Sequence, residues 1–199
     1  MSVIDYYFAP ISGYAYLGHQ ALMDLAREAG AQVSFRPVDM GRVQKEAGLR
    51  RPFDETSTSE DRIADRAAWA QRRGLRISPV PMHPPADPRL SCRVILAAGQ
   101  LGLDQGEVTA AILRGVWAEG RNVADPGDLC EALNQIDMPA LEILRRAETE
   151  AMRDAADDLN RDAIEKRILH SPTYVVGGTR IDGQEHIDRL RDVLGRAAA

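Results

Sequence analysis

The sequence is poor in thiols and in histidine clusters, and both shortages exclude kinds of site. Only two cysteines, Cys92 and Cys130, occur among 199 residues, and they stand far apart rather than as a Cys-x-x-C pair. Each falls in a helix-like segment, so we interpret both as small buried side chains rather than ligands of zinc or an iron–sulfur cluster. The four histidines lack the i, i+3 or i+4 spacing of metal ligands, so no metal site is expected.

Basic tracts and long apolar runs are also missing. The formal net charge is −5 and the pI about 5.4, without a basic arm, so nucleic acid is not an expected partner. No basic region followed by a long apolar stretch opens the chain, which predicts neither a signal peptide nor a membrane span and favours the cytoplasm. With 44% apolar and 28% charged residues, the chain can bury the core of one domain, or of one fold with a large insert.

What is present begins with a β-α-β pattern. Ser2–Phe8 is a short apolar and aromatic run, which predicts a buried strand. Apolar residues then recur at helical spacing over Gly13–Ala29, and Gly30 would end that helix. Ala31–Val38 alternates like a second strand. This order implies two parallel strands joined by a right-handed crossover.

The middle of the chain is predicted to be helical. The expected helices cover Ser57–Gly74, Pro88–Leu101, Gln105–Glu119, Pro126–Ile136 and Ala140 to about Leu169. A proline-rich stretch, Leu75–Pro88, must be an irregular loop. Near the end, strand, Gly-Gly and strand over Pro172–Ile181 predict a hairpin, followed by an amphipathic helix over residues 182–199.

The assembled order indicates the α/β class and a thioredoxin-like fold. An all-helical domain is inserted between an N-terminal βαβ half and a C-terminal ββα half, with expected ranges of 1–50, 51–150 and 151–199. Pro172 follows Ser171 at the start of the hairpin, a place where a sheet tolerates proline. In thioredoxin-like folds this proline is cis and faces the active-site turn.

Redox enzymes of this fold carry Cys-x-x-C where the first strand meets the first helix, and here Ser12–Ala15 stands in that place. Because thiol–disulfide exchange needs an attacking thiolate, the tetrapeptide excludes a disulfide oxidoreductase at this position. A helix N-terminus still favours a thiolate supplied from outside, for which glutathione is the obvious source. The Ser12 hydroxyl would donate to that sulfur and lower its pKa. The alternative is a plain N-cap.

The stretch YYFAPISGYAYLGHQAL (Tyr6–Leu22) resembles the opening of the 2-hydroxychromene-2-carboxylate isomerase family. That family belongs to the DsbA-like, kappa-class glutathione transferase branch of the thioredoxin superfamily. Further similar stretches follow in the family's order over nearly the whole chain: Phe35–Val43, Ala67–Leu75, Val116–Leu129 and Ser171–Leu190. No single motif is decisive, but their order and spacing together are fairly specific.

The resemblance implies a glutathione-dependent isomerase of aromatic compound catabolism. Its reaction would interconvert 2-hydroxychromene-2-carboxylate and trans-o-hydroxybenzylidenepyruvate by reversible thiolate addition to a conjugated double bond. The partner would be a small aromatic or conjugated carboxylate, and the protein a homodimer, as its relatives tend to be. The alternatives are a kappa-like glutathione transferase acting on another electrophile and a non-catalytic glutathione-binding protein.

The resemblance also implies roles for individual residues. Ser12 would be catalytic and hold the glutathione sulfur, while the backbone at Ser171 and Pro172 would pair with the cofactor as an added strand. The start of the last helix would meet the γ-glutamyl end, through Gly183, Gln184 and Glu185. A carboxylate at Glu185 suits the γ-glutamyl ammonium; the alternative is an acidic residue that simply favours a helix N-terminus.

The expected substrate side departs from the family. Gln44 stands where the family often has a lysine for the substrate carboxylate, and Gly13 replaces a proline. The segment Gly48–Thr56 lacks the family's usual asparagine. Arg42 and Gln44 are the expected substrate-binding residues, and positive charge could also come from Arg50 and Arg51, unless these arginines are solvated surface.

Overall fold

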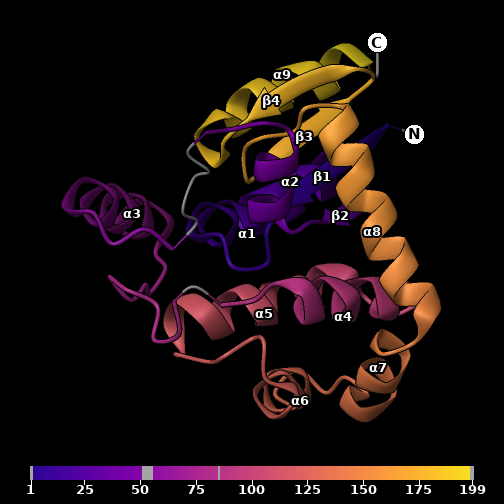
Figure 1. Cartoon of the computed structure of the whole chain (residues 1–199). Helices are drawn as coiled ribbons and strands as arrows, with labels where there is room; N and C mark the ends of the chain where they lie inside the picture. The colour runs from indigo at the N-terminus through magenta and orange to yellow at the C-terminus, as the bar shows by residue number, and fades with distance from the viewer. Residues whose placement is uncertain (1, 51–55, 85, 198–199) are drawn as a thin grey trace.

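A computed structural model describes residues 2–50, 56–84 and 86–197 (Figure 1). Its sheet has four strands in the order β2-β1-β3-β4. The strands are β1 (Val3–Phe8), β2 (Gln32–Pro37), β3 (Thr173–Val176) and β4 (Thr179–Asp182). β1 pairs parallel with β2 and antiparallel with β3, and β3 and β4 form an antiparallel hairpin. The predicted thioredoxin-like topology is confirmed.

The helices are α1 (Gly13–Glu28), α2 (Met40–Glu46), α3 (Glu60–Arg73), α4 (Arg89–Gln100), α5 (Gln105–Ala118), α6 (Pro126–Asn134), α7 (Ala140–Ala147), α8 (Glu150–Glu165) and α9 (Ile187–Ala197), with a 3₁₀ turn, η1, at Gln184–His186. Figure 1 shows α4 to α7 as a layer beneath the sheet, with α8 running from this layer back toward it. α3 stands apart at the side of α1.

The core lies around β1, which is buried because it is central in the sheet. Ile4, Tyr6 and Phe8 have no exposed surface, and the ring of Tyr6 stacks on that of Tyr174 from β3 at 5.6 Å between centroids. Several helices start where the sequence places caps: Asp104 accepts from two N–H groups at the start of α5, and Asp125 does the same for α6.

Two expected helix boundaries are wrong. The helix predicted from Ala140 to about Leu169 is two helices, because the chain breaks after Ala147 and ends its second helix at Glu165. At the break, the Ala147 carbonyl accepts from Arg93 of α4 at 2.9 Å, so this carbonyl is satisfied by a neighbouring helix. At the C-terminal end, Asp182 belongs to β4 rather than to the last helix.

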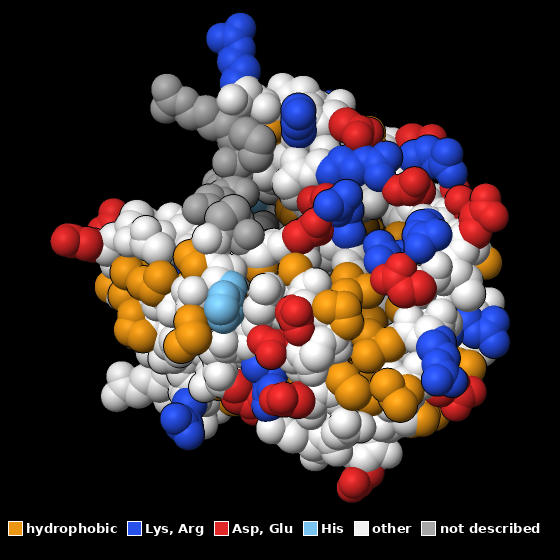
Figure 2. Space-filling model, turned by 60° about the horizontal axis from the view of Figure 1, so that its bottom comes forward, with side chains coloured by type: hydrophobic (Ala, Val, Ile, Leu, Met, Phe, Trp, Pro, Cys, Tyr) orange, Lys and Arg blue, Asp and Glu red, His pale blue; other side chains and the backbone are white. Residues whose placement is uncertain are grey.

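Other expectations lie partly outside the described residues. Arg51 and most of the segment Gly48–Thr56 belong to 51–55, so their part in a site stays a prediction, as do the domain boundaries. Within the described ranges, none of the helices combines the length and apolarity needed to cross a bilayer. The same residues contain no group of three His, Cys, Asp or Glu side chains suited to a metal ion. On the face in Figure 2, acidic and basic side chains lie interspersed.

Candidate functional site

A cavity of about 510 Å³ opens at the N-terminus of α1. Its lining comes from α1, α2, α3, the segment before β3, and the β4–α9 connection: Tyr14, Gln44, Arg62, Asp65, Trp69, Leu169, His170, Ser171, Asp182, Gly183, Glu185 and His186. We call Ser171, Asp182, Gly183 and Glu185 the sheet wall, and Arg62, Asp65 and Trp69 of α3 the helix wall. Four of the residues expected from the sequence, Gln44, Ser171, Gly183 and Glu185, meet here.

Ser12 lies behind the sheet wall as the N-cap of α1. Its side chain is fully buried, its Oγ accepts from the Ala15 N–H at 3.3 Å, and its hydroxyl donates to the Ser171 carbonyl at 3.2 Å. The Ser171 Oγ accepts in turn from the Ala9 N–H at 2.9 Å. Ser12 is therefore both a helix cap and a link to the hairpin. The Ser171–Pro172 peptide bond is cis.

Backbone donors remain available along this wall. Among the described residues, no acceptor pairs with the N–H of Ser171 or with that of Tyr14 in the first turn of α1. The same is true of the N–H groups of Gln184 and Glu185 at the start of η1. Unpaired N–H groups at helix starts give a positive potential that favours anions. The sheet wall can therefore hold an extended peptide-like ligand and its carboxylate.

The connection from β4 to α9 is held tightly against α1. Gly183 has a φ of 88°, and its N–H donates to the Pro172 carbonyl at 2.8 Å. Gln184 packs against Gly18, where an added Cβ would come within 2.5 Å of the Gln184 Cβ. The Gln184 Oε1 also accepts from Arg73 of α3 at 2.9 Å. Glu185, half-exposed, turns its carboxylate back over Gly183.

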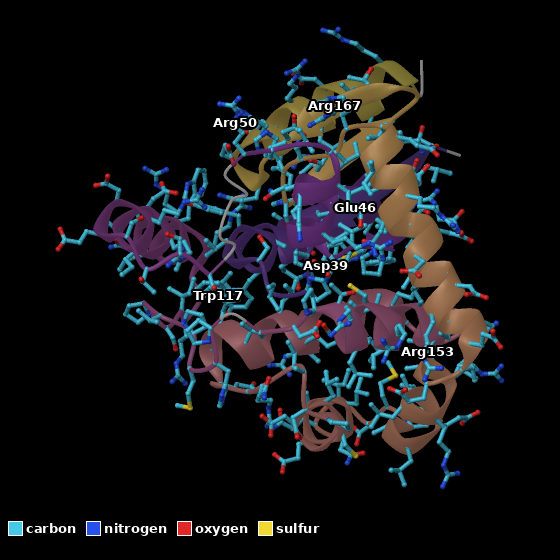
Figure 3. All side chains as sticks on the ribbon, in the orientation of Figure 1. Asp39, Glu46, Arg50, Trp117, Arg153 and Arg167 are labelled. Carbon is cyan, nitrogen blue, oxygen red and sulfur yellow. The ribbon has the colours of Figure 1, made fainter. Side chains whose placement is uncertain are left out.

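The turn before α1 is packed by two large side chains that the sequence gave no reason to group. An added Cβ at Gly13 would lie 2.8 Å from Arg66 and 2.9 Å from Trp117, so the absence of the family's proline matches tight packing here. The Trp117 indole, from α5 and labelled in Figure 3, donates to the Ile11 carbonyl at 3.0 Å. The buried Arg66 guanidinium lies over the Trp117 ring at 4.8 Å.

The two residues expected to bind substrate are placed differently. Gln44 is buried and lines the cavity, but its Nε2 donates to the Leu169 carbonyl at 2.9 Å. Arg42 lies away from the cavity, in ion pairs with Glu46 at 2.8 Å and with Asp157 of α8. Figure 3 shows Glu46 between α2 and α8. Arg50 is exposed and is not among the residues that line the cavity.

Neither cysteine reaches the site. Cys92 is buried in α4, where loss of solvation raises the pKa of its thiol well above the usual value, and Cys130 is half-buried in α6. A buried, un-ionised thiol is inert in disulfide exchange. The cavity therefore holds no sulfur nucleophile of the protein's own.

Sequence reasoning missed the helix wall. The Tyr14 hydroxyl donates to Asp65 at 2.7 Å, and the Arg62 guanidinium lies 5.7 Å from the centre of the Tyr14 ring. Burial, and secondarily the bond to Asp65, raise the pKa of Tyr14 to about 12, so its hydroxyl stays protonated. The i, i+3 and i+7 spacing of Arg62, Asp65 and Trp69 is the sequence signal that places these residues on one helix face.

Comparison with known proteins gives the family. The chain belongs to the DSBA-like thioredoxin domain family, which it matches over residues 3–195. It is 27% identical to the 2-hydroxychromene-2-carboxylate isomerase of Sphingobium xenophagum, covering 96% of this chain and 97% of that protein. The protein of the same name from Pseudomonas putida is 25% identical, over 98% of this chain and 95% of its own. The predicted family resemblance is confirmed.

Solved structures agree with the fold. A 2-hydroxychromene-2-carboxylate isomerase structure superposes with a TM-score of 0.74 at 21% identity, covering 98% of this chain and 96% of that one. The cytosolic disulfide reductase DsbM from Pseudomonas aeruginosa, solved with GSH, gives a TM-score of 0.68 at 18% identity, with 98% of both chains covered.

Proposed function

We propose that this protein is a glutathione-dependent isomerase that interconverts 2-hydroxychromene-2-carboxylate and trans-o-hydroxybenzylidenepyruvate or a close analogue. One observation carries the proposal. Relatives with this name align over nearly the whole chain, and a serine replaces the thiol at the start of α1. Thiolate chemistry at the start of α1 would therefore need a sulfur nucleophile from a ligand.

The residues of the sheet wall suit glutathione. The free N–H of Ser171 can pair with a main-chain carbonyl of a tripeptide, as an added strand does. The N–H groups of Gln184 and Glu185 suit the γ-glutamyl carboxylate, and the Glu185 carboxylate suits its ammonium. A cavity of about 510 Å³ is of the size that small ligands occupy.

Bound glutathione would supply a thiolate that adds reversibly to a conjugated double bond, which then rotates as a single bond. The protein's part is electrostatic. The Ser12 hydroxyl donates a hydrogen bond to the sulfur, and the N–H groups at the start of α1 lower the sulfur's pKa. Oriented N–H groups at this edge also stabilise the negative charge that develops on a substrate oxygen.

The remaining expectations belong to the same proposal. We expect a homodimer that takes a small aromatic or conjugated carboxylate as substrate, in the cytoplasm, as part of aromatic compound catabolism. The DsbM structure solved with GSH supports a glutathione site on this fold.

The test is an absorbance assay of 2-hydroxychromene-2-carboxylate turnover with and without glutathione, for the wild type and Ser12→Ala. Loss of one hydrogen-bond donor at a developing charge should lower kcat/KM about 100- to 1000-fold. Calorimetry and the ultraviolet band of bound thiolate give a second readout. Ser91→Ala is the matched control, since Ser91 is a buried serine at the start of α4. Absence of binding at millimolar glutathione would refute the cofactor assignment.

One observation favours a second candidate, a kappa-like glutathione transferase. Gln44 carries no charge where the family often has lysine, and its amide is used by the Leu169 carbonyl. Turnover of a chloronitrobenzene with glutathione, without isomerisation of the chromene carboxylate, would select this candidate. Glutathione binding with neither activity would indicate a binding protein.

A further inference from the structure

The two ends of the cavity differ in charge, which bears on where a charged substrate lies. The sheet wall contributes two carboxylates. Asp182 is already engaged, since Arg180 donates to it at 2.8 Å and the Thr173 hydroxyl at 2.6 Å. Glu185 lies at the end assigned above to the γ-glutamyl ammonium. In the proposed function the N–H groups of this end are used by the γ-glutamyl carboxylate, so a second anionic group, from the substrate, is disfavoured here because like charges repel.

The helix wall contributes one cation, Arg62, and one carboxylate, Asp65, to which the Tyr14 hydroxyl donates. Arg62 is the one Lys or Arg among the described residues that line the cavity. Its guanidinium lies over the ring of Tyr14, two residues beyond Ser12 in the chain, at 5.7 Å from the ring centre. The Tyr14 hydroxyl is bonded to Asp65 at 2.7 Å, which fixes the ring on which Arg62 rests. Arg62 is thus a positioned, half-buried charge near the start of α1.

Other basic groups are less suitable. Arg42 is outside the cavity, in ion pairs with Glu46 and Asp157. Of the histidines that line the cavity, His186 lies 3.8 Å from the Glu185 carboxylate, beside the sheet wall. A guanidinium also offers the planar pair of donors that matches a carboxylate.

We infer that Arg62 binds the carboxylate of the substrate and so sets specificity for acids. This inference rests on the proposed function, because it takes a conjugated carboxylate as the substrate. Arg62 supplies from α3 the positive charge that is expected from the lysine which the family often has at the position of Gln44. The substrate then lies between α3 and the start of α1, with its reactive double bond toward Ser12.

The test measures binding of an unreactive probe as well as turnover. Calorimetry compares trans-cinnamate with the uncharged cinnamamide, for the wild type, Arg62→Gln and Arg62→Lys. Loss of a charge-assisted hydrogen bond should weaken cinnamate binding about tenfold in Arg62→Gln and less in Arg62→Lys, with cinnamamide unchanged. Tyr14→Phe keeps the ring but loses the bond to Asp65, so it should weaken cinnamate binding by about threefold. Arg145→Gln, an exposed arginine of α7, is the control.

With the chromene carboxylate as substrate, Arg62→Gln should raise KM about tenfold and change kcat little. Equal cinnamate binding by the wild type and Arg62→Gln, or none by the wild type at millimolar concentration, would overturn the inference. Cinnamate binding that depends on Arg62 in a protein without isomerase activity would overturn the proposed reaction and leave the carboxylate subsite standing. The two failures are therefore distinguishable.

Discussion

The sheet wall and the helix wall of the cavity are built in different ways. The sheet wall offers mainly backbone groups: the N–H groups of Ser171 and Glu185, with that of the adjacent buried Gln184, and a glycine with positive φ at Gly183. The helix wall offers side chains of one face of α3, Arg62, Asp65 and Trp69. A backbone site depends on how the chain folds, whereas a side-chain site changes with single substitutions.

The chain keeps the family's pattern along the sheet wall and departs from it elsewhere. The stretch from Ser171 to Leu190 is similar to the family, while Gln44 and the segment 48–56 differ. In the proposed function, a ligand common to many relatives would lie on the sheet wall, and substrate preference would change at side chains such as Gln44. The following predictions test this division, from the largest expected effect to the smallest.

The largest expected effect concerns the contact between α1 and α5 of the helical layer. His19 of α1 is buried and bonds through Nε2 to the Gly106 carbonyl of α5 at 3.0 Å. Loss of solvation lowers its pKa from 6.5 to about 4, so the folded protein keeps it neutral where the unfolded chain binds a proton. His19 therefore contributes nothing to pH dependence above pH ~6.5, and stability falls by about 3 kcal/mol as pH drops from there to about 4.

Urea unfolding of the wild type and His19→Gln between pH 7 and 4 measures this effect. Glutamine can donate to the Gly106 carbonyl but does not titrate, so its stability curve should be flatter in this range. If the wild type and His19→Gln lose stability in parallel as the pH falls, His19 does not make the contact between α1 and α5 sensitive to acid.

The next test displaces the backbone of the sheet wall. In Gly18→Ala the new methyl group would lie 2.5 Å from the Gln184 Cβ, so η1 must move away from α1. We expect a loss of about 1 to 3 kcal/mol in stability, as for other overpacked positions. Glutathione binding should weaken about tenfold, which is about 1.4 kcal/mol of binding free energy. The reason is that the N–H groups of Gln184 and Glu185 shift.

Gly195→Ala in α9 is the matched control, because nothing lies within 4 Å of its added Cβ. This variant should keep glutathione affinity and gain up to about 1 kcal/mol in stability from helix propensity. Calorimetry and thermal unfolding of both variants separate the two effects. Unchanged glutathione affinity in a destabilised Gly18→Ala protein would remove η1 from the proposed cofactor site.

The smallest expected effect concerns Glu185, a side chain of the sheet wall. Glu185→Gln should weaken glutathione binding about three- to fivefold, because a half-exposed ion pair contributes up to about 1 kcal/mol. The difference should vanish for N-acetylglutathione, which lacks the ammonium. Glu142→Gln, an exposed acid in the first turn of α7, serves as the control. Equal losses for both ligands would show that Glu185 acts only on the helix start.

The sequence predicted those parts of the molecule that depend on neighbouring residues. The β1–α1–β2 opening, the start of α6 at Pro126 and the hairpin after Pro172 follow from local patterns. Ser12 stood out at the strand-to-helix junction, whereas the expected roles of Ser171 and Gly183 came from the family resemblance. The break after Ala147 was not predicted in this way; there the Ala147 carbonyl accepts from Arg93 of a helix far away in the chain, a contact that no local pattern reveals.

The helix wall escaped prediction for a similar reason. Arg62 and Asp65 lie in a polar helix, where charged residues usually face solvent. This face of α3 meets the start of α1 through residues distant in the chain: Arg66 packs against Gly13, and Tyr14 donates to Asp65. Likewise, Arg42 pairs with Asp157 of α8, a residue far away in the chain, although its sequence position near Gln44 suggested the cavity.

The bond between the Ser12 hydroxyl and the Ser171 carbonyl has a consequence for how ligand binding is coupled. A hydroxyl has one proton to donate, so a sulfur that receives it must displace this carbonyl. A neutral thiol is a weak acceptor, whereas a thiolate forms the stronger, charge-assisted bond. The Ser12 hydroxyl therefore favours a bound thiolate over a bound neutral thiol. It also releases the Ser171 carbonyl to accept from the ligand's own main chain, so in the proposed function sulfur capture and strand pairing are cooperative.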